Sequence, residues 1–227
     1  HKSKCKNNKI IENIINNFLI KKNSFIFESV EKRKFRGRYT IIGADPDKIW
    51  EFNKKKIHII ENNKKKLIKG DPYTFLEKLI ENFNFILPKN LPPLSSLLVG
   101  YFSYDIIRYI EKIPDECLDD LKIPDIRLLR PKTIIIHDNQ KKQIYFIVNC
   151  FADEQINNYE NYYSKMLQNI HFLKNLTFNY TLQNKIKVKS IKKINVKSNI
   201  SKGRFKKMVI KAKKYIKKGD IFQVVLS

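Results

Sequence analysis

The 227-residue sequence has few glycines, few cysteines and no long apolar run. With only 6 glycines it lacks a Gly-rich phosphate or dinucleotide loop, and it contains no nucleophile elbow. Its 3 cysteines, Cys5, Cys117 and Cys150, are far apart, which argues against a zinc site and favours reduced thiols. No stretch reaches the roughly 20 apolar residues that a membrane-spanning helix needs. We therefore expect a cytoplasmic protein with no membrane partner.

Acidic residues are also scarce: 46 Lys and Arg face only 22 Asp and Glu, so the formal net charge is +24. Such an excess is typical of proteins that bind nucleic acids or anionic membranes. Here, however, the basic residues are mostly lysines scattered over turns and helix faces, without a basic stripe interleaved with aromatic residues. Lys, Ile and Asn are abundant together, as A/T-rich codons would produce. We therefore expect no nucleic-acid partner.

Apolar periodicity predicts a packed mixture of helices and strands, supported by a hydrophobic fraction of 42% with 15 Phe and 11 Tyr. Helices are expected where apolar residues recur every three or four positions, at 10–18, 72–83, 104–109, 153–173 and 205–219. Strands are expected at 24–30, 38–44, 49–52, 57–61, 67–68, 97–101, 133–137 and 143–151, with a turn at 44–47. Strands and helices do not alternate regularly. The fold class is therefore α+β, with mixed or antiparallel, sandwich-like sheets and flanking helices.

The sequence changes character between residues 174 and 200, which are polar, rich in Asn, Lys and Ser, and weakly patterned. We expect one domain at 1–173, an interdomain linker at 174–200 and the start of a second domain at 201–227. The second part would contain an amphipathic helix that ends at Gly219 and an apolar strand that begins at Asp220. Because nothing follows this strand to cover it, we expect a fragment of a longer protein.

Four segments resemble the large subunit of anthranilate synthase. Residues 219–227 (GDIFQVVLS) resemble the start of that family's catalytic domain, and the preceding helix from Met208 is also similar. The other resembling segments are 27–30 with 36–46 (FESV, RGRYTIIGADP) and 100–111 (GYFSYDIIRYIE). Their order and spacing extend over nearly the whole chain. The resemblance implies an N-terminal regulatory region followed by the beginning of a chorismate-binding domain.

That family converts chorismate to anthranilate and pyruvate with Mg²⁺ and an ammonia donor. The resemblance implies a hetero-oligomer in which a glutamine amidotransferase small subunit delivers the ammonia, and feedback inhibition by tryptophan. It implies no catalytic or metal-binding residue in this sequence, because the family's metal-binding Glu residues and catalytic His belong to segments beyond Ser227. We therefore expect the fragment alone to be inactive.

By resemblance, the tryptophan site contains Ser29, its neighbour Glu28, and Arg38. The planar guanidinium of Arg38 suits the carboxylate of tryptophan. The Ser29 hydroxyl and the Glu28 carboxylate suit its ammonium, and Phe27 or Tyr39 would pack against its indole ring. In a strand Phe27 and Ser29 share a face while Glu28 points away, which favours a structural role for Glu28. The alternative is that Ser29 and Arg38 are ordinary polar residues at a sheet edge. Phe27 departs from the family, which usually has Leu there.

The motif at 100–111 contains Tyr104, Asp105 and Arg108, of which the last two can form an ion pair within one helical turn. We expect a structural role for this pair, and likewise for the amide of Gln223. Two other functions remain open: an aminodeoxychorismate synthase large subunit, which shares the fold, and a stand-alone amino-acid-binding regulatory module. The apolar final strand argues against the second, because a complete domain would not end on an unpaired apolar edge.

Overall fold

The computed structural model describes residues 1–4, 8–18, 21–28, 37–83, 86–116, 118–178 and 197–226. They belong to two compact units, His1–Leu182 and Gln183–Ser227, and each is described by itself. The first unit contains one sheet of 8 strands, and every pairing in it is antiparallel. Helices flank this sheet, so the predicted α+β class is confirmed.

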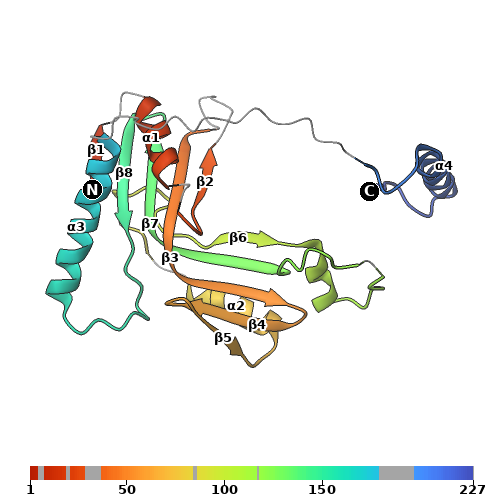
Figure 1. Ribbon diagram of the computed structural model, residues 1–227, viewed down its shortest axis with the longest axis horizontal. Helices are drawn as coiled ribbons and strands as arrows, with labels where there is room; N and C mark the ends of the chain where they lie inside the picture. The colour runs from red at the N-terminus through yellow and green to blue at the C-terminus, as the bar shows by residue number, and fades with distance from the viewer. Residues whose placement is uncertain are drawn as a thin grey trace. The chain divides into compact units, whose positions relative to one another are not determined.

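Two long strands, β3 (Tyr39–Asn53) and β7 (Ile126–Asp138), pair with each other along the whole sheet (Figure 1). In one half of the sheet they are flanked by β2 (Phe25–Glu28), β8 (Gln143–Val148) and β1 (Lys2–Lys4). In the other half they are flanked by β4 (Lys56–Glu61), β5 (Lys64–Ile68) and β6 (Val99–Phe102). What the sequence predicts as sandwich-like sheets is therefore a single continuous sheet with two halves.

The two halves meet where Pro46 of β3 lies opposite Pro131 of β7, and the register shifts between Pro46 and Lys48. Proline has no N–H to donate, so central strands admit it only at such an irregularity. A bulge also bends a strand and increases its twist, and the long strands bend in this region (Figure 1). The turn predicted at 44–47 is therefore wrong, because these residues form a bulge inside β3.

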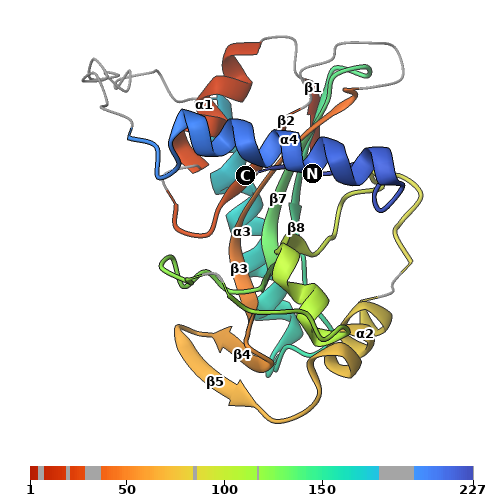
Figure 2. The same cartoon turned by 90° about the vertical axis from the view of Figure 1, so that its right-hand side faces the viewer.

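Two helices, α1 (Asn8–Phe18) and α3 (Tyr159–Phe178), pack on one face of the first half of the sheet; α3 runs along β8 in both views (Figures 1 and 2). Apolar residues recur every three or four positions along α1 and form one face, which is buried at Ile11, Ile14 and Phe18. Burial of such side chains contributes roughly 1.5–3 kcal/mol each. The opposite face of the sheet holds a second apolar cluster, which includes Ile41, Ile134 and Ile136 and packs against Leu91 and Leu97.

The second half of the sheet packs against α2 (Pro72–Asn82) and the 3-10 helix η1 (Tyr104–Tyr109), around a core that contains Trp50 and Phe52. The start of α2 follows the sequence prediction, because the Asp71 carboxylate accepts a hydrogen bond of 2.9 Å from the backbone N–H of Thr74. No helix in the described ranges is both long and apolar enough to span a bilayer.

Helix α3 begins at Tyr159 rather than at residue 153, and it continues to Phe178, five residues past Leu173. Asn158 caps its first turn by accepting a hydrogen bond of 3.0 Å from the N–H of Asn161. The predicted start is wrong because Asp153 and Glu154 are held instead by basic residues of β7. The predicted linker at 174–200 falls largely on residues 179–196, which lie outside the described ones.

In the second unit, α4 (Lys202–Lys218) is capped at its start by the hydroxyl of Ser201 and ends at Gly219, whose φ of 80° is left-handed. The strand predicted from Asp220 is wrong for residues 220–226, which have no regular structure. A strand requires a partner for its backbone N–H and C=O groups. No described strand pairs with this segment.

Candidate functional site

Four of the five predicted effector-site residues lie together. One open hollow of about 600 Å³ is lined by Phe27 and Glu28 at the end of β2, by Arg38 just before β3, and by Tyr39 at the start of β3. Ile26, Gly37, Ile41 and Leu94 complete its walls. Ser29 lies outside the described residues, so its predicted role in the site stays a prediction.

The antiparallel pairing of β2 with β3 explains this grouping, because it brings Phe27 opposite Ile41 and Glu28 opposite Thr40. Successive side chains of a strand point to opposite faces, so Phe27 shares the face of Ile41 and Glu28 lies on the other. The Phe27 side chain is 52% exposed although its ring lies 5.2 Å from that of Phe25. It therefore offers apolar surface at an edge strand where a ligand ring can stack.

Arg38 is held in place by Asp138, the last residue of β7. Its Nε lies 3.1 Å and its Nη2 2.8 Å from Oδ2 of Asp138, and its guanidinium lies 4.8 Å from the centre of the Tyr39 ring. Oδ1 of the same carboxylate also accepts hydrogen bonds from the backbone N–H groups of Gln140 and Lys141 in the β7–β8 turn. One buried carboxylate thus fixes both the arginine and the turn.

The electrostatics of this pair are mutual. Hydrogen bonding to Asp138 raises the pKa of Arg38. Burial acts to raise the pKa of Asp138, but the hydrogen bonds from Arg38 and the turn N–H groups outweigh it, so this pKa is lowered. Sequence reasoning missed Asp138, which carried only a turn signal. Its partner is 100 residues away, and no local pattern marks such a contact.

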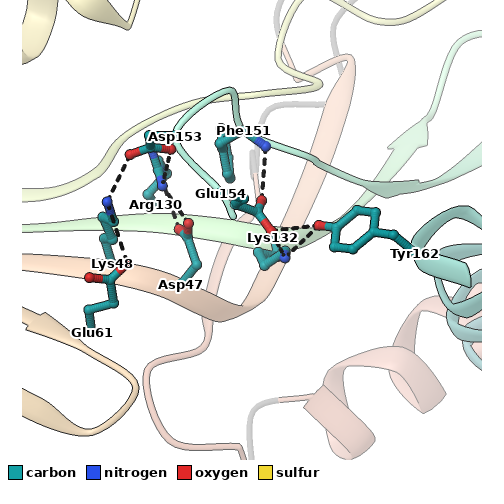
Figure 3. Close-up of polar contacts among 9 residues, drawn as sticks. All are labelled: Asp47, Lys48, Glu61, Arg130, Lys132, Phe151, Asp153, Glu154 and Tyr162. Carbon is teal, nitrogen blue, oxygen red and sulfur yellow. Dashed lines mark hydrogen bonds and ion pairs between the residues drawn. The ribbon is translucent and has the colours of Figure 1, made fainter. Parts of the chain in front are cut away.

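A second polar cluster lies at the bend of the sheet (Figure 3), where Asp47 follows Pro46 and Arg130 precedes Pro131. Arg130 bridges Asp47, at 2.9 Å from its Nε, and Asp153, at 2.9 Å from its Nη2, while Phe151 lies 4.0 Å from the guanidinium. Lys48 joins Asp153 at 2.8 Å to Glu61 at 3.4 Å. The cluster ties β3 and β7 to the segment before α3. All its charges are paired internally, which indicates a structural role.

Lys132, Glu154 and Tyr162 form a third contact set next to this cluster (Figure 3). The Lys132 ammonium donates to the Glu154 carboxylate at 2.6 Å and to the Tyr162 hydroxyl at 2.9 Å. The same hydroxyl lies 2.6 Å from Glu154. Burial and the hydrogen bond to Glu154 raise the pKa of Tyr162, so its hydroxyl stays protonated and donates to that carboxylate.

The motif at 100–111 has a structural explanation. A Cβ at Gly100 would lie 1.7 Å from the carbonyl oxygen of Arg127, so only glycine lets β6 pair this closely with β7. Asp105 accepts from Nε of Arg108 at 2.8 Å, which confirms the predicted ion pair. Arg108 also donates to the carbonyl of Pro114 at 2.7 Å and so fastens the segment after η1. The side chains of Tyr104 and Gln223 are exposed, and neither lines the hollow of Arg38.

Magnesium, which the resemblance implies, has no site among the described residues. In that part of the chain, no three His, Cys, Asp or Glu side chains are grouped so that they could hold a metal ion. The carboxylates of the bend cluster are instead saturated by Arg130 and Lys48.

Comparisons with known proteins agree with the resemblance. The chain is 34% identical over 209 residues to anthranilate synthase component 1 of Acetivibrio thermocellus, covering 89% of this chain and 42% of that protein. It is 30% identical over 210 residues to the same component of Cereibacter sphaeroides, covering 90% and 42%. The crystal structure of anthranilate synthase component I from Streptococcus pneumoniae TIGR4 matches with a TM-score of 0.59 at 21% identity, covering 85% of this chain and 41% of that one. At this identity the match shows that the two chains share a fold.

The chain thus spans about two fifths of the length of these relatives. A family model described as chorismate binding enzyme matches residues 22–227. This match includes β2, β3 and the hollow between their ends. By this match, the chain belongs to the family of chorismate binding enzymes.

Proposed function

We propose that this chain is the effector-sensing part of an anthranilate synthase large subunit. In the whole protein, chorismate and ammonia would give anthranilate and pyruvate, with magnesium held outside the residues described here. A glutamine amidotransferase subunit would supply the ammonia, which makes the enzyme a hetero-oligomer. The curated relatives named above support this, since both carry the anthranilate synthase name and match about 90% of this chain.

The observation that carries the sensing role is the hollow lined by Phe27, Glu28, Arg38 and Tyr39. Tryptophan has an apolar ring, an ammonium and a carboxylate, and each finds a chemically matched group there. The indole would lie against Phe27 and Tyr39, and the ammonium near the Ser29 hydroxyl, since Glu28 lies on the other face of the strand. Asp138 occupies Nε and Nη2 of Arg38. No described residue accepts a hydrogen bond from Nη1 of Arg38, so its two N–H groups are available to the ligand carboxylate.

The feedback test uses Ser29→Leu in the complete enzyme, assayed by the appearance of anthranilate at saturating chorismate and magnesium. We expect the tryptophan concentration for half inhibition to rise at least tenfold while kcat stays within about twofold, because Leu removes a hydroxyl and adds bulk where the ligand ammonium would bind. Ser164→Leu, at an exposed position of α3, is the matched control and should be inhibited normally. Unchanged inhibition of Ser29→Leu would overturn the assignment.

The same assay tests the reaction itself. Formation of 4-amino-4-deoxychorismate without pyruvate would instead identify an aminodeoxychorismate synthase. A complete enzyme that forms neither product with glutamine and its partner subunit, or with ammonium salts, would refute the proposed activity.

A further inference from the structure

A second hollow lies on the other face of the sheet, between α3, the middle of β3 and β7, and the end of β8. Its volume is about 360 Å³, at the small end of the range of about 300–1,000 Å³ typical of ligand pockets. Thr133 of β7 lines it, and strand alternation places Thr133 on the face of Ile135, whereas the Arg38 hollow contains Ile41 of the opposite face. The two hollows are therefore separate sites.

The inner walls of this hollow are apolar and include aromatic and sulfur-containing side chains. Val148 and the buried Leu173 lie on the side of the core, and Met166, Phe172 and Tyr162 come from α3. Phe172 is 58% exposed, so its ring is accessible to a bound molecule. A thioether beside aromatic rings favours a flat aromatic ligand over a branched aliphatic one.

One wall is held rigid before any ligand arrives. The hydroxyl of Tyr162 contacts both Lys132 and Glu154, at 2.9 Å and 2.6 Å (Figure 3). A side chain fixed at its polar tip presents its ring in one orientation. Preorganisation of this kind lowers the entropy that binding costs.

The charges that line the hollow leave one cation in excess. Lys21 pairs with Asp45 at 3.0 Å, and Lys132 pairs with Glu154 at 2.6 Å. Lys165, the third lysine of the lining, pairs with no carboxylate of the described residues. Asn169, one helical turn after Lys165, adds an amide at the same rim. The site therefore suits a ligand that carries a single negative charge.

We propose that this hollow binds a small aromatic monocarboxylate, with its ring against Met166 and Phe172 and its carboxylate at Lys165. The site does not depend on the function proposed above. Its failure would leave the tryptophan site at Arg38 untouched, because the two lie on opposite faces of the sheet.

The chain carries its own reporters for a test, since its 2 methionines are Met166 in the hollow and Met208 in α4. The full chain, labelled with ¹³C at the methionine methyl groups, is titrated with benzoate, benzyl alcohol and benzylamine while NMR follows both signals; Met166→Leu assigns them. We expect benzoate to shift the Met166 signal saturably and to leave Met208 in place. Benzyl alcohol should bind at least tenfold more weakly, a difference of about 1.4 kcal/mol or more, and benzylamine should not bind.

Lys165→Gln should weaken benzoate binding about tenfold, while Lys174→Gln, further along the same helix and outside the hollow, should not. Asn169→Phe, at an exposed rim position, should block the site without unfolding the chain. The proposal is overturned if benzoate does not shift Met166, or shifts Met208 equally. It is also overturned if Lys165→Gln and the wild-type chain bind benzoate with the same affinity, or if benzyl alcohol binds as tightly as benzoate.

Discussion

In the half of the sheet that contains β1, β2 and β8, the β3–β7 pair has an arginine near each end, Arg130 at the bend and Arg38 at the far end. Each arginine is bound to a buried carboxylate, yet the two differ in exposure to solvent. At the bend, the Arg130 side chain is 8% exposed and bridges Asp47 and Asp153. At the other end, the Arg38 side chain is 34% exposed and holds Asp138 alone. The same ion-pair chemistry thus gives a closed structural joint at the bend. Beside the candidate effector hollow it gives a cation that is anchored but still reachable.

The largest effect should come from Arg130→Met. The substitution leaves Asp47, which is 14% exposed, as a buried charge without its partner. Loss of one partner of a buried pair costs about 3–5 kcal/mol, so we expect a loss of this size in the free energy of unfolding, measured by urea denaturation. Arg130→Lys keeps the positive charge but not the bidentate hydrogen bonding, so its free energy of unfolding should lie between those of Arg130→Met and the wild type.

A loss below about 1 kcal/mol in Arg130→Met would contradict this account. It would mean that Asp47 regains water when the arginine is removed, so that the bend is held by the two prolines and the apolar core instead.

At the other end, Asp138→Asn should destabilise the protein less, by about 1–3 kcal/mol, since the amide keeps one oxygen acceptor for the turn but loses the charge that binds Arg38. Because Arg38 is then released, tryptophan inhibition of the complete enzyme should also weaken, with kcat unchanged. Chemical denaturation and the anthranilate assay measure the two effects separately. Asp120→Asn, in an exposed loop, is the control.

A normal tryptophan response in Asp138→Asn, together with the expected stability loss, would show that Arg38 serves the β7–β8 turn only. The comparison between the two arginines would then lose its functional half, and Arg38 would be a structural residue like Arg130.

The contrast also shows what the sequence could predict. Local patterns were sufficient for β4 and for α2, whose start Asp71 and Pro72 mark directly, and for the start of β8, which ends at Val148 rather than at Phe151. They failed where a segment distant in sequence determines the local structure. Residues 44–47 form part of β3 rather than a turn, and Pro46 lies opposite Pro131 of β7.

The same reason explains what was missed in the candidate site. The hollow of Phe27, Glu28, Arg38 and Tyr39 follows from neighbouring strands, so a motif from one stretch of sequence located four of its lining residues. Asp138 reaches Arg38 across 100 residues, and Asp47 reaches Arg130 across 83. Such partners depend on sheet register, which local periodicity does not contain.

The bend cluster should also make stability depend on pH. Burial acts to raise the pKa of Asp153, but Arg130 and Lys48 outweigh it and lower the pKa from 3.8 to about 2. The group therefore stabilises the fold fully above about pH 4, and this contribution is lost as the pH falls toward 2. Urea midpoints at constant ionic strength should fall more steeply from pH 4 to pH 2 in the wild type than in Asp153→Asn. Equal slopes would show that Asp153 is not coupled to the cluster.

The smallest effect should come from Lys65→Met on the edge strand β5. Lys65 lies 2.8 Å from Glu51, which is as close as the pairs at the bend, but its side chain is 52% exposed. Glu51 also keeps Arg127 at 3.1 Å after the substitution. The loss in unfolding free energy should therefore stay below about 1 kcal/mol and shrink further in 0.5 M salt. A loss as large as that of Arg130→Met would mean that distance, not burial, sets the strength of these pairs, and the contrast between Arg130 and Arg38 would have no physical basis.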